Sequence, residues 1–254
     1  MKRAFPKPVV FLAVFVFWTG IWFLASRMVG SELLLPSPIQ VLQTFLALAG
    51  TTEFWLIVGT SILRVLTGIL SAIVLGVLLA VLTESSSLFK TLLSPLMTLV
   101  KSTPVASFII LALIWLGRSI LPAAISALMV LPVVWANVSA GIASQNPQLL
   151  ELARVYGFSR GRILRRVTLP SVMPYFRSAL SSALGLGWKA GIAAEVLTVP
   201  QRSIGKMIFE SKLYLETTDL FAWTVAVILL SLLIERVLLK LIRQFDRKGG
   251  AAGA

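Results

Sequence analysis

The sequence of 254 residues contains no cysteine and no histidine, and only 13% of its residues are charged. Without cysteine, the chain has no disulfide, no thiolate nucleophile and no zinc–sulfur site. Without histidine, it lacks the commonest metal ligand and the one side chain that titrates near neutral pH unperturbed. Most familiar catalytic constellations are therefore unavailable, and we do not expect an enzyme.

The low charge content also excludes an ordinary soluble domain, in which about 25% of residues are charged. Hydrophobic residues make up 57% of the sequence, and no Ser, Asn or Gly tract replaces the missing charge. Disordered and collagen-like chains are therefore excluded as well. We predict an all-α polytopic membrane bundle.

Six apolar segments are long enough to cross a bilayer, which takes about 20 residues per helix. The predicted spans are 9–26, 60–83, 92–117, 119–144, 174–199 and 219–241. Such spans use about half of the chain. Residues 1–254 are therefore expected to form a single transmembrane domain, with short loops and no soluble catalytic domain.

The first span has two interpretations. It follows Lys2, Arg3 and Lys7, and a basic start before an apolar run is also the pattern of a cleaved signal peptide. Trp18 and Trp22 lie within the run, which also lacks a clear small-residue cleavage site. These features favour a membrane anchor. After this span, Ser37 and Pro38 predict a short helix over 39–49 at the outer interface.

The net charge of +13 is distributed unevenly between the two predicted sides of the membrane. Fourteen of the 23 basic residues fall on one side, namely Lys2, Arg3, Lys7, Lys90, Arg154, Arg160, Arg162, Arg165, Arg166, Arg177, Lys240, Arg243, Arg247 and Lys248. Five fall on the other side, namely Arg27, Arg118, Arg202, Lys206 and Lys212. The positive-inside rule makes the richer side cytoplasmic, with both termini on it. Because topology explains this charge, no nucleic-acid partner is expected.

Small residues recur every four positions in the second and fifth spans. They are Gly68, Ala72, Gly76 and Ala80, followed later by Ala179, Ala183, Gly187 and Gly191. Such spacing lets helix backbones approach closely in a membrane. Tight packing within one bundle is the simplest interpretation. The lining of a moving gate or a subunit interface is the alternative.

The cytoplasmic loop over 145–172 has strong helix signals. Asn146 and Pro147 predict a helix start, and Gly157 predicts its end. Ser159 is expected to cap a second short helix that Pro170 stops, and Pro174 is expected to begin the next span.

The two short helices are expected to be amphipathic. One face of the first helix is expected to carry Leu149, Leu150, Ala153 and Tyr156. Arginines surround the second helix, which gives the loop a basic rim. This loop is either a basic segment held near lipid headgroups or a docking element for a soluble partner.

The same loop resembles a known motif. Glu151-Leu152-Ala153, then Gly157, then Val167-Thr168-Leu169-Pro170 is similar to the E-A-A…G…I-x-L-P loop of ATP-binding-cassette importer permeases. Leu35-Pro36-Ser37-Pro38, Ile114-Trp115-Leu116-Gly117 and Ala193-Ala194-Glu195 resemble the nitrate/sulfonate/taurine/bicarbonate branch, which also includes transporters of pyrimidine precursors of thiamine.

This resemblance implies that the loop is a coupling helix seated in a groove of a cytoplasmic ATPase. Glu151, Ala153 and Gly157 would seat it, and Arg154, Arg160 and Arg162 would face acidic ATPase surface. The remaining motif residues in this coupling site are Leu152, Leu169 and Pro170.

The chain contains no Gly-x-x-x-x-Gly-Lys-Ser/Thr phosphate loop, so ATP is expected on a partner. The resemblance implies a dimer of permease subunits, an ATPase dimer and an extracytoplasmic solute-binding protein. It also implies a multi-pass protein embedded in the lipid of the bacterial inner membrane.

Charged residues within spans are costly unless they are paired or hydrated. Arg64 and Arg236 lie near span ends, from which long side chains reach the interface. Lys101, Lys189 and Glu195 are either structural ion-pair partners or residues that line the translocation pathway. The basic excess among them favours an anionic solute.

A secondary carrier driven by protons or sodium ions is the alternative function. Such a carrier needs acidic groups within the membrane, and Glu195 is nearly alone there. Inverted repeats are common in these carriers, and none is convincing in this sequence.

Overall fold

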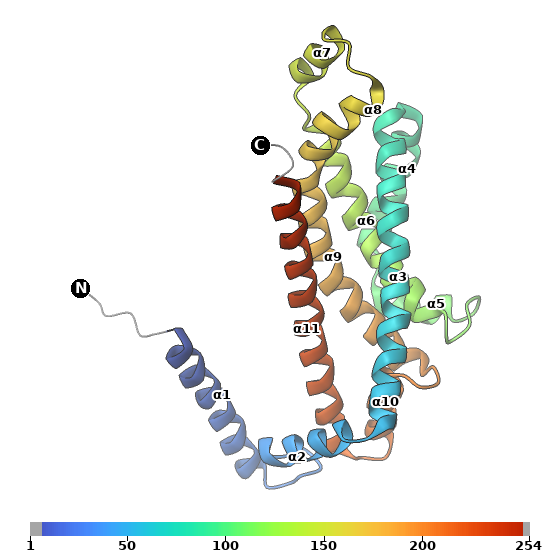
Figure 1. The fold of residues 1–254 in the computed structure, drawn as a ribbon. Coiled ribbons are helices and arrows are strands. Elements are labelled where there is room, and N and C mark those ends of the chain that lie inside the picture. The colour runs from blue at the N-terminus through green and yellow to red at the C-terminus, as the bar shows by residue number, and fades with distance from the viewer. Residues whose placement is uncertain (1–6, 251–254) are drawn as a thin grey trace.

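The computed structural model describes residues 7–250, and every regular element in that range is a helix. The elements are α1 (Lys7–Val29), α2 (Pro38–Ala49), α3 (Thr52–Ser85), α4 (Ser87–Ser102), α5 (Val105–Ala112), α6 (Leu121–Ala143), α7 (Pro147–Val155), α8 (Arg160–Ile163), the π-helix η1 (Leu164–Thr168), α9 (Leu169–Thr198), α10 (Ile204–Leu213) and α11 (Thr217–Gly250). The prediction of an all-α bundle is confirmed. In Figure 1, α7 and α8 lie at one end of the bundle, and α2 and α10 lie at the other.

Three helices, α3, α6 and α9, form the centre of the bundle. A Cβ at Gly68 of α3 would lie 2.1 Å from the Ala123 carbonyl oxygen of α6. A Cβ at Gly187 of α9 would lie 2.7 Å from Ile69 of α3, and one at Gly191 would lie 2.4 Å from Ser126 of α6. The small residues therefore let the helix backbones approach within one bundle, as the simpler interpretation predicted.

The third predicted span, 92–117, is not one continuous helix. It is divided into α4 and α5, which meet at an angle of 103°. Thr103 has extended backbone angles because the ring of Pro104 excludes the helical conformation from the residue before it. Pro104 also lacks an N–H group to continue the helix. The second part ends at Ala112, so the prediction was too long at its C-terminal end.

The predicted stop at Pro170 and new start at Pro174 are also wrong. Helical structure continues from α8 through η1 into α9, with Pro170 in the first turn of α9 and Pro174 inside the helix. The wider turn of the π-helix accommodates the disruption that a proline causes. The Ser171 hydroxyl donates to the Val167 carbonyl oxygen at 2.8 Å, which satisfies one of the local acceptors.

Four helices in the described range are long and apolar enough to cross a membrane, and the α4–α5 pair makes a fifth if it crosses once. The four are α1, α3, α6 and α11. The predicted six spans also included α9, which has 30 residues but falls outside this set. Lys189, Glu195 and several serines reduce its hydropathy. Because α9 buries a long face against other helices, it needs less apolar surface than a lipid-facing helix.

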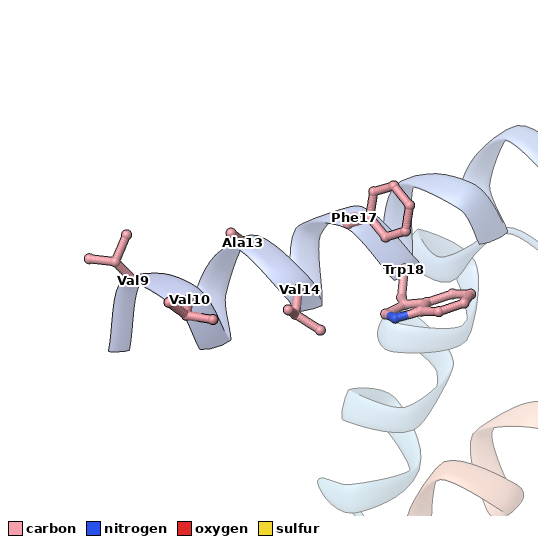
Figure 2. A pocket seen from close by; sticks show the side chains of 6 residues that line it. All are labelled: Val9, Val10, Ala13, Val14, Phe17 and Trp18. Atoms are coloured by element: carbon pink, nitrogen blue, oxygen red, sulfur yellow. The ribbon is translucent and has the colours of Figure 1, made fainter. Parts of the chain in front are cut away.

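Helix α1 diverges from the bundle, whereas its C-terminal end is anchored (Figure 1). The Trp22 indole N–H donates to the Pro36 carbonyl oxygen at 3.1 Å, and its ring stacks on Phe221 of α11. The N-terminal half of α1 carries an apolar hollow of about 550 Å³, shown in Figure 2. It is lined by Val9, Val10, Ala13, Val14, Phe17 and Trp18.

Helix α2 has the start that the sequence predicted. The Ser37 hydroxyl accepts from the Gln40 backbone N–H at 3.4 Å, and the Gln40 side-chain oxygen accepts from the Ser37 backbone N–H at 2.9 Å. This reciprocal pair is a capping box, and Pro38 occupies the first turn.

Candidate functional site

Helix α7 begins at the residues that the sequence predicted. The Asn146 side-chain oxygen accepts from the Gln148 backbone N–H at 2.9 Å, and Pro147 occupies the first turn. Asparagine satisfies a free N–H here, and proline in the first turn has no N–H that would remain unpaired. The predicted start is confirmed.

Helix α7 ends in a Schellman motif. The Phe158 N–H donates to the Ala153 carbonyl oxygen and the Gly157 N–H donates to the Arg154 carbonyl oxygen, both at 2.9 Å. Gly157 has φ of +69°, a conformation that glycine adopts without steric cost. The glycine therefore reverses the chain directly after α7, as its position in the sequence predicted.

The apolar residues of α7 differ in exposure. Ala153 is buried and Leu150 is half-buried, and the Phe158 N–H folds back onto the Ala153 carbonyl oxygen. An exposed apolar stripe consists of Leu149, Leu152, Val155 and Tyr156, which are 51–78% exposed. The predicted face joined Leu149 and Tyr156 to Ala153 and Leu150. Leu149 and Ala153 are four positions apart on α7 and so lie on the same side of the helix, but the four residues differ in exposure.

The basic rim lies on α8 and η1. Arg160 and Arg162 are exposed, and the Arg162 guanidinium lies 5.3 Å above the centre of the Phe158 ring. Gly161, Arg162, Arg165 and Arg166 line a hollow of about 540 Å³. Ser159 occupies the cap position, but its side chain makes no capping hydrogen bond.

The remaining predicted coupling residues lie on the exterior of this end of the bundle. Glu151 and Arg154 are exposed on α7, while Leu169 and Pro170 are exposed at the start of α9. Ala153 is thus the one buried member of the nine-residue set. The structure brings the set together in one region around α7, α8 and the start of α9.

The three predicted pathway residues lie in different environments. Lys101 is exposed in the last turn of α4, beside the bend, and Lys189 is exposed on α9. Neither lysine has an ion-pair partner among the described residues. Glu195, only six residues after Lys189, has no exposed surface. The structure therefore does not bring the three charges together.

Glu195 forms an ion pair with Arg64 of α3. The Arg64 guanidinium donates to the Glu195 Oε1 atom at 2.5 Å, and the Ser61 hydroxyl donates to Oε2 at 2.8 Å. The Gly205 backbone N–H also points to Oε2, at 3.3 Å. Arg64 thus turns inward instead of reaching the interface, because a buried carboxylate needs a neutralising partner.

Sequence reasoning missed Ser61, Arg64 and Gly205 as members of this network. Arg64 and Glu195 are 131 positions apart in the chain, so no local pattern connects them. One usable signal was the spacing of Ser61 and Arg64, since residues three apart share a helix face. Two polar residues on one face of an apolar span indicate a polar partner on another helix.

The chain is similar to proteins of known families. The model of the family described as "Binding-protein-dependent transport system inner membrane component" matches residues 72–248. The taurine transport system permease protein TauC of Escherichia coli is 27% identical over 223 residues, which cover 84% of this chain and 80% of TauC. The formylaminopyrimidine transport permease protein ThiX of Halalkalibacterium halodurans is 30% identical over 190 residues, which cover 73% and 74%.

A solved structure has the same fold. It is the bacterial alginate ABC transporter in complex with an alginate pentasaccharide-bound periplasmic protein. It matches with a TM-score of 0.61 and 19% identity, over 95% of this chain and 96% of that chain. The family match extends from the middle of α3 through α7 to α11. The chain therefore belongs to the family of binding-protein-dependent transport system inner membrane components.

Proposed function

We propose that this chain pairs with a second copy to form the translocation pathway of an ATP-driven importer. A solute-binding protein delivers a small polar or anionic solute on the outer side. A cytoplasmic ATPase dimer binds ATP and docks on α7 of each copy. The chain itself carries no catalytic site, and it lies in the bacterial inner membrane with both termini cytoplasmic.

The observation that carries the proposal is the construction of α7. The helix is closed at both ends by local hydrogen bonds and presents an exposed apolar stripe beside exposed arginines. An apolar strip with a charged rim is the form of a helix that inserts into a partner's groove. The family match includes this segment, and the E-A-A-like motif lies on it.

The pairing with a second copy is supported by α9. This long helix exposes Ser178, Ser182 and Lys189 at intervals of about one or two turns. Polar and charged side chains are costly against lipid tails, so we expect this face to line a hydrated space between two copies. Buried small residues occupy the opposite side of the same helix.

The solute class is supported by charge and by relatives. Lys101 and Lys189 are exposed and lack ion-pair partners among residues 7–250, while Arg64 neutralises Glu195. The pathway candidates therefore carry excess positive charge. Relatives include TauC and the nitrate import permease protein NrtB of Leptolyngbya laminosa, which is 29% identical over 211 residues. An anionic solute agrees with both observations.

Transport then follows from alternating access. Closure of the ATPase dimer on ATP would draw the two α7 helices together and open the pathway outward. Hydrolysis and separation would reset the inward-facing state. Helix α9 would transmit the movement because helical structure runs without interruption from Arg160 to Thr198.

The decisive experiment substitutes Ala153 of α7 in the complete transporter. Ala153→Asp places a carboxylate at a position that is 7% exposed, so the closed C-terminal end of α7 must rearrange to hydrate the charge. Gln148→Glu adds the same charge at an exposed position of α7 and is the matched control. We expect Ala153→Asp to abolish ATPase binding and solute-stimulated hydrolysis, while Gln148→Glu retains both. Full activity in Ala153→Asp would overturn the coupling assignment, and transport by the chain alone without ATP would favour the ion-driven carrier.

A further inference from the structure

The start of α10 is attached to two other helices by side chains. The Gly205 N–H donates to the Glu195 carboxylate of α9, and the Ile204 N–H donates to the Ser61 hydroxyl of α3 at 2.9 Å. The first N–H groups of a helix have no partner within the helix, and its N-terminus attracts negative charge. Glu195 and Ser61 therefore cap α10 from outside, and Ser61 itself donates to Glu195.

Helices α9 and α10 are packed so closely at Gly205 that neither can move toward the other. A Cβ at Gly205 would lie 2.3 Å from both the backbone carbon and the Cβ of Glu195. The two backbones therefore touch at the capped end. A displacement of α10 must either carry α9 with it or break the hydrogen bond to Glu195.

The segments that flank α10 are strained. Among the described residues, the three non-glycine positions with positive φ are Val199 (48°), Arg202 (48°) and Leu215 (60°), and they lie on both sides of α10. Valine is β-branched, so this conformation is a marked outlier for it. Such strain persists only where surrounding contacts fix the backbone, and it is concentrated at switch regions.

Arg64 connects the ion pair to the strained segment. One guanidinium nitrogen binds Glu195, and the other donates to the Gln201 carbonyl oxygen at 3.3 Å. Gln201 lies between the strained Val199 and Arg202. Arg64 thus holds the strained connection and the α10 cap at the same time.

The hydrogen-bond network of Glu195, Ser61 and Arg64 lies between α10 and the long helical segment that leads toward α7. Helix α10 lies at the end opposite α7 (Figure 1), and its last residue Leu213 and the following Tyr214 and Leu215 are 63–67% exposed. From Glu195, continuous helical structure extends to Arg160 beside α7. At 1.5 Å per residue the path along this helical segment is about 50 Å long. It joins the α10 contact on one side to the docking helix on the other.

We infer that Glu195 is a positioning residue which, with Ser61 and Arg64, couples α10 to α9. The solute-binding protein displaces α10, and the ion pair passes this displacement through α9 to the ATPase. The inference rests on the proposed function, because it requires both partners. It assigns the buried pair to signal transmission, whereas the exposed Lys101 and Lys189 remain the candidates for contact with the solute.

The test uses the complete transporter, with permease, ATPase and solute-binding protein in proteoliposomes. Glu195→Gln removes the charge and keeps the side-chain shape. Glu210→Gln is the matched control. Glu210 and Lys206 both lie on α10 and form an ion pair at 3.4 Å that is more exposed than the pair of Glu195 with Arg64. We expect the ratio of binding-protein-stimulated to basal ATPase rate to fall at least fivefold in Glu195→Gln. The control should keep the ratio of the unsubstituted protein.

A second readout follows α10 directly. Ile204 is completely buried, and the chain has no cysteine, so Ile204→Cys introduces the only thiol. Its reaction with a membrane-impermeant maleimide should be at least tenfold faster when Glu195→Gln is added, and unchanged when Glu210→Gln is added. A purely structural ion pair would lower the melting temperature without changing the ATPase ratio of the folded complex.

The outcomes separate the inference from the proposed function. If the unsubstituted transporter shows no stimulation by the binding protein, the proposed function fails. If it is stimulated and Glu195→Gln keeps the same ratio and the same labelling rate, the inference is overturned. If Glu195→Gln does not assemble, Arg64→Gln/Glu195→Gln removes both charges together. A normal ratio and labelling rate in this double variant would overturn the inference equally.

Discussion

Substitution by alanine should change the thermal stability in opposite directions at two glycines of α3. A Cβ at Gly68 would lie 2.1 Å from the Ala123 carbonyl oxygen, whereas a Cβ at Gly59 would have no atom within 4 Å. Both residues lie in the interior of one helix. In both variants alanine improves helix propensity by about 1 kcal/mol, so this contribution cancels between them.

The clash at Gly68 sets the size of the difference in melting temperature between the two variants. Normal contact at a Cβ begins near 3.4 Å, so α6 must move away from α3 by about 1 Å. Overpacking of this kind costs about 1–3 kcal/mol. A change of 1 kcal/mol shifts the melting temperature of a chain of this size by about 2–4 °C. Gly68→Ala should therefore melt about 2–12 °C below Gly59→Ala.

The measurement is thermal unfolding of the purified permease in detergent, followed by the fluorescence of its seven tryptophans. The unsubstituted protein should melt between the two variants or close to Gly59→Ala. Equal melting temperatures for Gly59→Ala and Gly68→Ala would refute the close approach of α3 and α6. The same result would remove the packing argument for the whole α3–α6–α9 centre.

Further predictions concern the docking segment and the pathway. Gly157→Ala should weaken ATPase binding about fivefold or more, since a positive φ costs a non-glycine residue about 1–2 kcal/mol. Gly161→Ala should leave the ATPase affinity unchanged, because a Cβ there meets no other atom within 4 Å. Equal affinities of these two variants would contradict the cap assignment. Leu152→Ser should weaken ATPase binding without lowering the melting temperature, because this side chain is 52% exposed; unchanged binding in a titration would exclude the stripe as the contact. Asn146→Ala should cost about 1 kcal/mol of helix stability, and hydrogen exchange at the start of α7 should accelerate about fivefold; an unchanged exchange rate would show that the cap is dispensable. Lys189→Glu should reduce import of anionic solutes, and an unaltered uptake rate would remove Lys189 from the pathway.

Local signals explain which elements were predictable. The start of α7 at Asn146, its end at Gly157 and the capping box at Ser37 depend on neighbouring residues alone, and all three are confirmed. The stripe of small residues on α3 likewise predicted close packing. In each case the chemistry of a few adjacent or regularly spaced residues determines the result.

Tertiary context explains what was missed. Pro104 was visible in the sequence, but apolarity alone does not reveal that the chain bends by 103° there. The sequence predicts a stop at Pro170 because the π-helix before it has no recognisable signal. The sequence predicts that Arg64 reaches the interface, because its partner, Glu195, lies on a helix distant in sequence. Pairings of this kind depend on the arrangement of the whole bundle.

The closed ends of α7 have a consequence for the speed and cost of assembly. A segment that becomes helical only on contact loses its conformational freedom at that moment, and the affinity is lower by that amount. Asn146 at one end and Gly157 at the other already fix α7 in the isolated chain. A partner therefore meets a preorganised surface and can associate as a rigid body. Repeated engagement and release during a transport cycle would then require no refolding of the contact.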